Sequence, residues 1–475
     1  MRPHPSWSSI RSVAIVFAVL GSVGAILLVT APTTSATTYV RGIISVPTTW
    51  GGGADINYTV IGPLTIRPSG ALTIMPGTIV RFDPGVHLFV EGRLTADGTP
   101  AKPITFTANN TGSPFPWGGI QFNASSSGSV SWSTFDRADR AITATDSSPN
   151  IISNTILQAG VGFAFVRSSS FVSSNTILRA TNVGVYANAS NVQITNNAIN
   201  ATGIGIQVEQ PGTPTISRNT ITNVSSGFAM GILLTAGATA SIDGNMIQGV
   251  RGFSGAPGGV PGAPGRDGSI GAGIYVVAAP SASITANTID SVTGGRGGDG
   301  QAIAGGTGGR GGNGGSAAGI VVVGTPGATI QWNMITTVSG GSGGAGGGSA
   351  TTVTGGRGGD AGSAVAIEVA SSSGSSQLSA NTVDVVAGGN GGAGGKGATN
   401  GNGGAGGDAE GLFLIIAMNA DASGNSIQTV RGGIGGNGAA AGGGSGIGGT
   451  GARRTALRSS MSPASRRSTP TPSRR

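Results

Sequence analysis

The sequence predicts an all-β solenoid, in which one short unit is stacked on copies of itself. The first observation is a phrase, Asn, any residue, then Ile or Val, that occurs nine times. Its asparagines are Asn154, Asn175, Asn197, Asn219, Asn245, Asn287, Asn333, Asn381 and Asn425. The first three steps between them are 21, 22 and 22 residues. A fixed period near 22 residues indicates stacked copies of one supersecondary unit.

A second landmark explains why the later steps grow to 26, 42, 46, 48 and 44 residues. It is a Gly followed by an apolar residue, at Gly162, Gly184, Gly205, Gly231, Gly273, Gly319 and Gly411, with Ala366 replacing the Gly once. The distance from this landmark to the next Asn stays at 13 to 15 residues, whereas the distance from Asn to landmark grows from 8 to as many as 33. Every added residue therefore enters at one corner of the coil, as loops on one face of a solenoid do.

The elements between these landmarks are predicted to be short strands. Runs rich in Val, Ile and Thr are bounded by Gly, Asn and Ser, and no sustained 3.6-residue periodicity follows the N-terminus. Residues 72–82 and 88–94 alternate apolar and polar side chains, and turn residues separate them. We expect residues 37–150 to hold capping strands and the first coils, and residues 151–430 to hold the repeats.

These patterns resemble a known family. Residues 37–150 resemble the opening coils of right-handed parallel β-helix proteins of prokaryotic (archaeal or bacterial) cell surfaces, and the Asn phrase resembles their pectate-lyase-like coil repeat. The resemblance covers roughly residues 40–430 and implies a single right-handed parallel β-helix. An Asn at the same corner of each coil can bond its amide to the Asn above and below, so a structural Asn ladder is expected. The fold hosts enzymes, adhesins and passive surface proteins alike, so it implies no activity.

Residues 1–36 are predicted to be a signal peptide or an N-terminal membrane anchor. Arg2 and Arg11 precede or flank an uncharged apolar run over residues 13–31, and Thr34-Ser35-Ala36 offers a small-residue cleavage site. The rest of the chain is then extracellular or at the cell surface, with membrane contact only if residues 13–31 stay uncleaved. The sequence has no Cys, so stacking must stabilise it without disulfides.

The formal charge of +8 does not indicate a nucleic-acid partner. Two basic residues lie in the first 36 residues and seven in the last 23, which leaves 17 basic against 18 acidic residues in the body. The body is therefore close to neutral, and no basic stripe of the kind that binds nucleic acid is evident.

Glycine-rich inserts are expected at 251–269, 294–316, 339–363, 387–409 and 431–451. Two interpretations of the inserts remain open. The inserts are mobile loops, because Gly costs the most backbone entropy to order. Alternatively, their Gly-Gly-X period suits a three-residue extended helix of the polyproline II type, and bare Gly faces let such helices pack closely as a polyglycine II-like layer.

No catalytic, cofactor or metal residue is predicted. The mature chain has one His, His87, which is expected to face outward from a strand. Asp290 and Asp384 share a coil position with Thr336 on the coil between them, and about 9.6 Å by stacking is near the outer limit for an inverting acid pair. Asp243 lies alone, two residues before its Asn.

Residues 294–299 and 355–360 match the start of a Ca²⁺-binding nonapeptide, but the expected large apolar residue is missing and the unit is not repeated. The pairs Arg296/Asp299 and Arg357/Asp360 are better read as weak surface ion pairs. Glycosylation sequons open at Asn57, Asn109, Asn123, Asn188, Asn200 and Asn223.

Residues 452–475 are expected to be a basic disordered tail, either a tether to an anionic surface or a sequence produced by truncation or a frameshift. The predicted function is a non-enzymatic secreted or cell-surface structural or adhesion protein, a rod presenting a Gly-rich face. Cell-surface polysaccharide or other surface proteins are its expected partners. The alternative is an extracellular polysaccharide lyase or hydrolase.

Overall fold

The structure is a computed structural model that describes residues 37–53, 57–110, 112–200, 202–350, 353–370, 372–415, 420–439, 449–451 and 454–460. Its regular structure is entirely β-strand in these residues, and the strand pairings are parallel. By contacts the chain divides into Met1–Ser35 and Ala36–Arg475. The predicted signal segment, with residues 13–31, lies outside the described residues. Among the described residues, no helix has the length and apolar character needed to cross a membrane.

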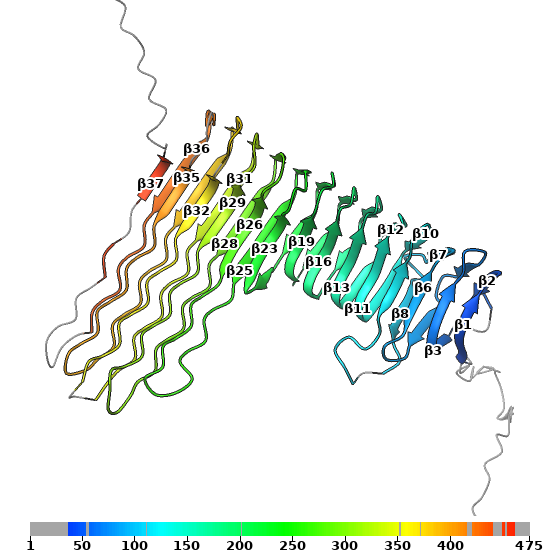
Figure 1. Ribbon diagram of the computed structural model, residues 1–475, viewed down its shortest axis with the longest axis horizontal. Helices are drawn as coiled ribbons and strands as arrows, with labels where there is room; N and C mark the ends of the chain where they lie inside the picture. The colour runs from blue at the N-terminus through cyan, green and yellow to red at the C-terminus, as the bar shows by residue number, and fades with distance from the viewer. Residues whose placement is uncertain are drawn as a thin grey trace, which may run out of the picture. The chain divides into compact units, whose positions relative to one another are not determined.

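Each coil has three faces, which we name by their order along the chain (Figure 1). Face 1 follows the ladder asparagine, face 2 contains the Gly-apolar landmark, and face 3 precedes the next asparagine. In the coil that starts at Asn197, these faces are β18 (Ala198–Asn200), β19 (Thr202–Glu209) and β20 (Thr215–Ser217). Each strand pairs in parallel with its equivalents one coil before and after, as β18 does with β21 and β19 with β23.

The remaining strands fall into the same three faces. Face 1 contains β5 (Ile79–Phe82), β8 (Ile104–Ala108), β15 (Thr176–Ile177), β21 (Thr220–Thr222), β22 (Ser225–Ser226), β25 (Met246–Gly252), β28 (Thr288–Thr293), β31 (Met334–Ser339), β34 (Thr382–Ala387) and β36 (Ser426–Arg431). Face 2 contains β6 (His87–Val90), β9 (Gly119–Phe122), β16 (Ala180–Asn188), β23 (Phe228–Leu234), β26 (Ile270–Val277), β29 (Ala317–Val323), β32 (Ala364–Ala370), β35 (Ala409–Ile415) and β37 (Arg454–Ser460).

Three long strands pair with strands of both face 1 and face 2: β3 (Asn57–Ile66), β11 (Ser133–Thr145) and β13 (Thr155–Val166). A fourth, β1 (Thr37–Ile44), pairs with β3 along both of its parts. Face 3 forms a separate sheet of β2 (Pro47–Trp50), β4 (Ala71–Ile74), β7 (Arg93–Asp97), β10 (Ser127–Ser131), β12 (Asn150–Ile152), β14 (Phe171–Ser173), β17 (Gln193–Thr195), β24 (Ala240–Asp243), β27 (Ala282–Thr285), β30 (Thr329–Gln331) and β33 (Gln377–Ser379), together with β20.

The core is a set of inward-facing columns that run from coil to coil. The Ile or Val of the Asn phrase forms one column, in which Ile247, Ile289 and Ile335 are in register and fully buried. Ile242 and Ile284 belong to the matching column of face 3. Burying one such side chain is worth roughly 1.5–3 kcal/mol, so each coil adds a similar increment.

The corner before each ladder asparagine uses a left-handed backbone conformation. The preceding residues all have positive φ: Ser153, Ser174, Asn196, Arg218, Gly244, Ala286, Trp332, Ala380 and Gly424, with φ from 53° to 66°. A single αL residue turns the chain sharply from face 3 into face 1. The repeat is therefore defined by a backbone conformation as well as by the recurring asparagine. The residue type at the αL position varies from coil to coil.

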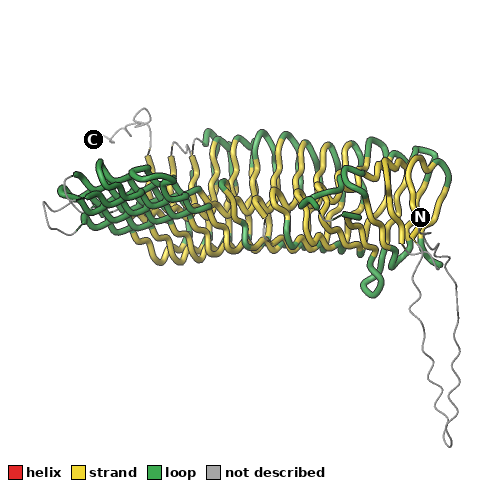
Figure 2. Tube along the Cα trace, turned by 90° about the horizontal axis from the view of Figure 1, so that it is seen from below, coloured by secondary structure: helices red, strands yellow, loops and turns green. Residues whose placement is uncertain are grey.

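Five inserts leave the corner between face 1 and face 2, as the growing steps predicted. They occupy 253–269, 294–316, 340–363, 388–408 and 432–453. Each has an outward run and a return run, and the runs of successive inserts lie side by side (Figure 1) in a lattice beyond the strands (Figure 2). We call the described residues of these inserts the glycine slab.

Seven residues of the C-terminal tail form a strand where the sequence predicted disorder. Residues 452–475 were expected to be disordered, yet β37 (Arg454–Ser460) pairs with β35 along its whole length. Register explains the difference, because the last insert returns the chain to face 2 at the level where a further strand can extend the ladder. Residues 461–475 lie outside the described part of the chain.

Candidate functional site

Hydrogen bonds between inserts organise the glycine slab. In the Gly-Gly-X triplets of the first four inserts, the N–H of the first glycine typically donates to the third-residue carbonyl of the next insert, as Gly343 does to Asn390 at 2.9 Å. The N–H of the second glycine donates to a run in the other layer, as Gly344 does to Gly312 at 2.8 Å. Outward and return runs therefore form two layers that are bonded within themselves and to each other. This favours the ordered, polyglycine II-like reading of the inserts.

Glycine is required at these positions by close approach rather than by positive φ. A Cβ added at Gly344 would lie 1.9 Å from the carbonyl oxygen of Gly298, and one at Gly392 would lie 1.9 Å from that of Gly344. Real Cβ atoms essentially never approach a backbone atom this closely. An alanine in the second position would therefore push adjacent runs apart and break their hydrogen bonds.

Asx side chains satisfy the third-position N–H groups of the slab. The Asn313 N–H donates to Asp267 Oδ1 at 2.6 Å, and the Asp360 N–H donates to Asn313 Oδ1 at 3.0 Å. The Ala405 N–H continues the column by donating to Asp360 Oδ1 at 2.8 Å. At least one carboxylate or carboxamide in each of the first four inserts thus bonds the backbone of the next insert. Periodic Asp and Asn in the return runs were the sequence signal for this column, and sequence reasoning missed it.

Arginines lie beside these acids. Arg296 contacts Asp299 and Arg357 contacts Asp360, each at 2.5 Å, as the spacing of three residues predicted. Arg310 reaches Asp360 from the preceding insert at 3.6 Å. These side chains are about half exposed, so each pair contributes little. No group of three or more acidic, His or Cys side chains suited to a metal ion occurs in the described residues.

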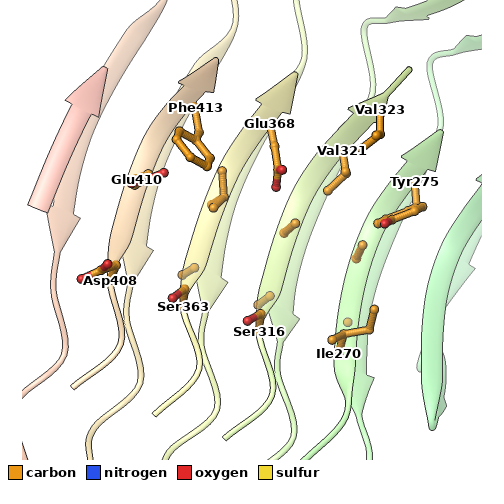
Figure 3. Close-up of a pocket in the computed structure, with 16 residues that line it drawn as sticks. Ile270, Tyr275, Ser316, Val321, Val323, Ser363, Glu368, Asp408, Glu410 and Phe413 are labelled. Carbon is orange, nitrogen blue, oxygen red and sulfur yellow. The ribbon is translucent and has the colours of Figure 1, made fainter. Parts of the chain in front are cut away.

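A groove of about 340 Å³ lies where the slab joins face 2 (Figure 3). Its slab side carries Ser316, Ser363 and Asp408, which are third-position or insert-terminal residues, and its face-2 side carries Tyr275 and Glu368. Burial, followed by the charge of Glu410, raises the pKa of the Glu368 carboxyl above its usual value. Burial and the Glu368 charge likewise raise the pKa of the Tyr275 hydroxyl.

Glu410 comes from the neighbouring strand and is almost completely buried, at 5% exposure. In the β32–β35 register it is opposite Val365, while Phe413 is opposite Glu368. The groove therefore combines three carboxyl groups, those of Glu368, Asp408 and Glu410, with the aromatic rings of Tyr275 and Phe413. These residues are spread over the four coils from β26 to β35. Sequence reasoning missed Glu368 and Glu410, because the inserts separate them in sequence by 42 residues.

Toward the N-terminal coils the outer surface of face 2 becomes apolar. Met230, Leu233 and Ala272 form a second buried cluster, distinct from the core inside the coils. Tyr275 packs against this cluster. The groove thus runs from an apolar end at β26, beside this cluster, to an acidic part at β32 and β35.

The nine asparagines of the repeated phrase are hydrogen-bonded in one uninterrupted column. At its middle, Asn245 Nδ2 donates to Asn287 Oδ1 at 2.9 Å, and Asn287 Nδ2 donates to Asn333 Oδ1 at 3.0 Å. The Asn287 N–H also donates to Asn333 Oδ1 at 3.0 Å, and Asn287 Nδ2 donates to the Ile242 carbonyl at 2.9 Å. The carboxamide thereby joins the backbones of successive corners inside a buried bend.

Asp290 and Asp384, which share a coil position, are not assembled for acid–base chemistry. Asp290 accepts hydrogen bonds from the Thr336 hydroxyl and from Gln248 Nε2, the latter at 3.1 Å. The Thr336 bond is the main reason that the pKa of Asp290 is lowered, so this carboxyl stays ionised and is unsuited to act as a general acid. Asp384 accepts from Gln428 Nε2 at 3.1 Å.

The remaining predicted residues lie on the surface or at coil edges. Asp243 accepts from the Thr285 hydroxyl at 2.7 Å. His87 lies on β6, and its ring stacks on Phe89 with centroids 5.3 Å apart. Of the sequon asparagines, Asn109 and Asn223 are exposed, and the other four are half-buried: Asn57, Asn123, Asn188 and Asn200.

Comparison with known proteins agrees with this architecture. Residues 104–247 match the family described as a right-handed beta helix region. Together with the parallel coil-to-coil pairing and the absence of helices from the described residues, the match makes the fold a right-handed parallel β-helix. Among curated proteins, Protein bark beetle of Drosophila melanogaster is 44% identical over 50 residues, which are 10% of this chain and 2% of that protein.

Several solved structures are similar at low sequence identity. A mutant of the periplasmic alginate epimerase AlgG is 11% identical with a TM-score of 0.33, over 68% of this chain and 73% of that one. A mannuronic acid-specific family 6 lyase from human gut microbiota is 10% identical with a TM-score of 0.28, over 72% and 78%. The nine-helix polyproline II antifreeze protein of Granisotoma rainieri is 22% identical with a TM-score of 0.15, over 44% and 97%.

Proposed function

We propose that this chain is a non-enzymatic secreted or cell-surface structural protein, in which a β-helical rod presents the glycine slab as a contact surface. Cell-surface polysaccharide and other surface proteins are its proposed partners. The observation that carries the proposal is the slab itself. Its hydrogen bonds recur from triplet to triplet between successive inserts, and most of its glycines stand where a Cβ would collide with a neighbouring run. A simple linker would require neither property.

The groove favours a second candidate, an extracellular polysaccharide lyase or hydrolase. A carboxyl whose pKa is raised, beside a second carboxyl, is what a general acid in glycoside hydrolysis requires. Glu368 has this property, with Glu410 on the next coil and Tyr275 on the same groove wall. Under this alternative, Glu368 would protonate a glycosidic oxygen, and Glu368→Gln would abolish turnover without unfolding the chain.

The proposal also includes a location outside the cytoplasm and N-linked glycosylation. The N-terminal apolar run supports export, and Asn109 and Asn223 are the sequon residues that offer the most exposed side chains. Treatment of the secreted protein with a glycosidase specific for N-linked glycans, followed by intact mass measurement, tests the modification. An unchanged mass would exclude it.

A matched pair of proteins tests the structural role. In the variant, inserts 294–316, 340–363 and 388–408 are each replaced by the two-residue link Leu178-Arg179, which joins β15 to β16. Both proteins are passed over immobilised pectin, alginate, chitin and peptidoglycan, and released sugar is assayed with and without Ca²⁺. The proposal expects retention of the full chain on at least one polymer, at least tenfold weaker retention of the variant, and no released sugar.

Circular dichroism controls for folding of the insert variant, whose β signal should persist. Released sugar that Glu368→Gln abolishes would overturn the structural role in favour of the enzyme. Equal retention of both proteins, or no retention of the full chain on any of the four polymers, would also contradict the proposed role of the slab.

A further inference from the structure

Two tryptophans are exposed at equivalent positions of the corner between face 3 and face 1. Trp132 is 42% exposed and Trp332 is 62% exposed, whereas Trp50 and Trp117 are buried. Both exposed tryptophans occupy the left-handed position of the corner, with φ of 46° and 56°. Their backbone N–H groups donate to the carbonyl that precedes the corner in the next coil, at 3.3 and 3.2 Å. The two rings therefore belong to one column along the same edge of the β-helix.

Tryptophan is an unfavourable residue at this position. A bulky side chain with positive φ is a conformational outlier, and an exposed indole ring leaves apolar surface in water. Other coils place Gly244, Ala286 or Asn196 at the equivalent position. The buried tryptophans stack on other rings, whereas neither exposed ring does so within the described residues. Because the fold gains nothing evident from these two rings, they indicate a ligand.

A groove of about 400 Å³ lies beside the first of these rings. Its apolar lining includes Trp132, Pro100 and Pro103, and none of its lining residues is charged. Its polar lining includes three partly exposed threonines in register on successive coils: Thr134, Thr155 and Thr176. The negative face of an indole ring attracts the C–H groups of a sugar ring, and hydroxyl groups donate to and accept from sugar hydroxyls. The groove thus has the chemistry of a saccharide site.

The edge between the two tryptophans is almost free of charge. Seven coil steps separate them, which is about 34 Å at a strand spacing of about 4.8 Å. The left-handed residues between them are Ser153, Ser174, Asn196, Arg218, Gly244 and Ala286. Only Arg218 in this column is charged, and Asp243, immediately before Gly244, has the opposite sign. No row of cations is present here to pair with the carboxylates of a uronic acid polymer, so an uncharged chain fits this edge best.

We propose that this corner binds an uncharged polysaccharide, with Trp132 and Trp332 as stacking platforms for two of its sugar rings. The inference goes beyond the proposed function, because the glycine slab leaves a different corner, between face 1 and face 2. A polymer that reaches both platforms makes its second contact at a high effective concentration. It should therefore bind more tightly than an oligosaccharide that reaches only one platform.

Biolayer interferometry with the immobilised full chain tests the proposal. The probes are the uncharged polymers xyloglucan, galactomannan, laminarin and amylose, with alginate as a charged polymer. At least one uncharged polymer should bind, and Trp132→Ala and Trp332→Ala should each weaken that binding at least tenfold. Trp132→Phe, which keeps an aromatic ring, should retain most of it. Alanine already occupies this corner at Ala286 and Ala380, so both alanine variants should keep the β signal in circular dichroism.

Two controls separate the platforms from general stickiness. Tyr39→Ala removes an exposed aromatic ring on β1, 68% exposed, and should leave binding unchanged. A trisaccharide cut from the bound polymer is too short to reach both platforms. It should bind at least tenfold more weakly than the polymer, and each single tryptophan variant should lose at most half of its trisaccharide sites.

Several results would overturn the proposal. They are binding to none of the four uncharged polymers, an equal loss in Tyr39→Ala, and loss of alginate binding in the tryptophan variants, which would make a charged polymer the ligand. Dimers in sedimentation that Trp332→Ala disperses would make a second copy the occupant. Loss in the insert variant but not in the tryptophan variants would place the binding on the slab. An insert variant that binds the uncharged polymer normally but fails the earlier retention test would support the corner.

Discussion

Asn287 shows how much one residue of the ladder holds together. It is fully buried, its Oδ1 accepts from Asn245 at 2.9 Å, and its Nδ2 donates to Asn333 at 3.0 Å and to the Ile242 carbonyl at 2.9 Å. Asn287→Ala would leave buried donors and acceptors on three coils without partners. Each such group costs about 1–3 kcal/mol, so we expect a loss of roughly 3–5 kcal/mol in urea unfolding followed by circular dichroism.

Asn425→Ala is the matched control for this change. Asn425 ends the described column and is partly exposed, so water can replace its partners. We expect a loss below about half of that for Asn287→Ala. Equal losses at the two positions would show that the ladder does not derive its stabilisation from burial.

The left-handed corners predict opposite effects for two substitutions at equivalent positions. Gly244 has φ of 62°, and a Cβ there would make only an ordinary 3.6 Å contact with Arg218. Gly244→Ala should therefore destabilise by about 1 kcal/mol through backbone conformation alone. Ala380, with φ of 55°, already bears that cost, so Ala380→Gly should stabilise by a few tenths to 1 kcal/mol in the same unfolding assay. Shifts of the same sign would refute this account.

The raised pKa of Glu368 predicts how the stability of the folded protein depends on pH. Its pKa in the folded protein is raised above the ordinary value of 4.5 by burial and by the Glu410 charge, so the folded state binds the proton more tightly than the unfolded chain does. Its contribution to folding is therefore most favourable below about pH 4.5 and is lost as the pH rises through the raised pKa. Glu368→Gln should raise the melting temperature at pH 7 and leave it nearly unchanged at pH 4. Glu91→Gln on an exposed ion pair serves as the control.

At the scale of elements, the second-position glycines determine whether an insert packs into the slab. Gly344→Ala places a Cβ 1.9 Å from the Gly298 carbonyl oxygen, whereas Ala345→Ser changes an adjacent third-position side chain that is partly exposed. We expect amide exchange of residues 340–363 to become at least tenfold faster in Gly344→Ala and to stay the same in Ala345→Ser. Unchanged protection in both would mean that the runs are held by something other than close glycine contacts.

The sequence could predict the strands of face 1 and the positions of the inserts, because these follow from the regular spacing of two landmarks. The Asn phrase located the start of face 1 in nine coils, and the distance from Asn to the Gly landmark located the inserts at one corner. Neither landmark reports which residues on different coils become neighbours across an insert. Glu368 and Glu410 meet only because two inserts of similar length return their strands to face 2 in register. The Asp267–Asn313–Asp360 column depends on register in the same way.

At the scale of the whole β-helix, each coil is stabilised mainly by contacts with its two neighbours. Stability in such a solenoid is approximately a sum of nearest-neighbour terms, so a coil with one described neighbour should open first. Burial follows this expectation, since Ile289 in the middle is fully buried whereas Ile427, in the same column position on β36, is only partly buried.

Two identical substitutions test this gradient. Ile289→Ala should cost about 2–5 kcal/mol, because it removes a fully buried side chain and leaves a cavity between two intact coils. Ile427→Ala should cost less than half as much, because part of that side chain already contacts water. In wild-type protein, amide exchange should be fastest in β36 and slow steadily through β34 and β31 toward β28. Equal costs, together with uniform exchange along these four strands, would mean that the β-helix unfolds as one cooperative unit rather than from its C-terminal coils.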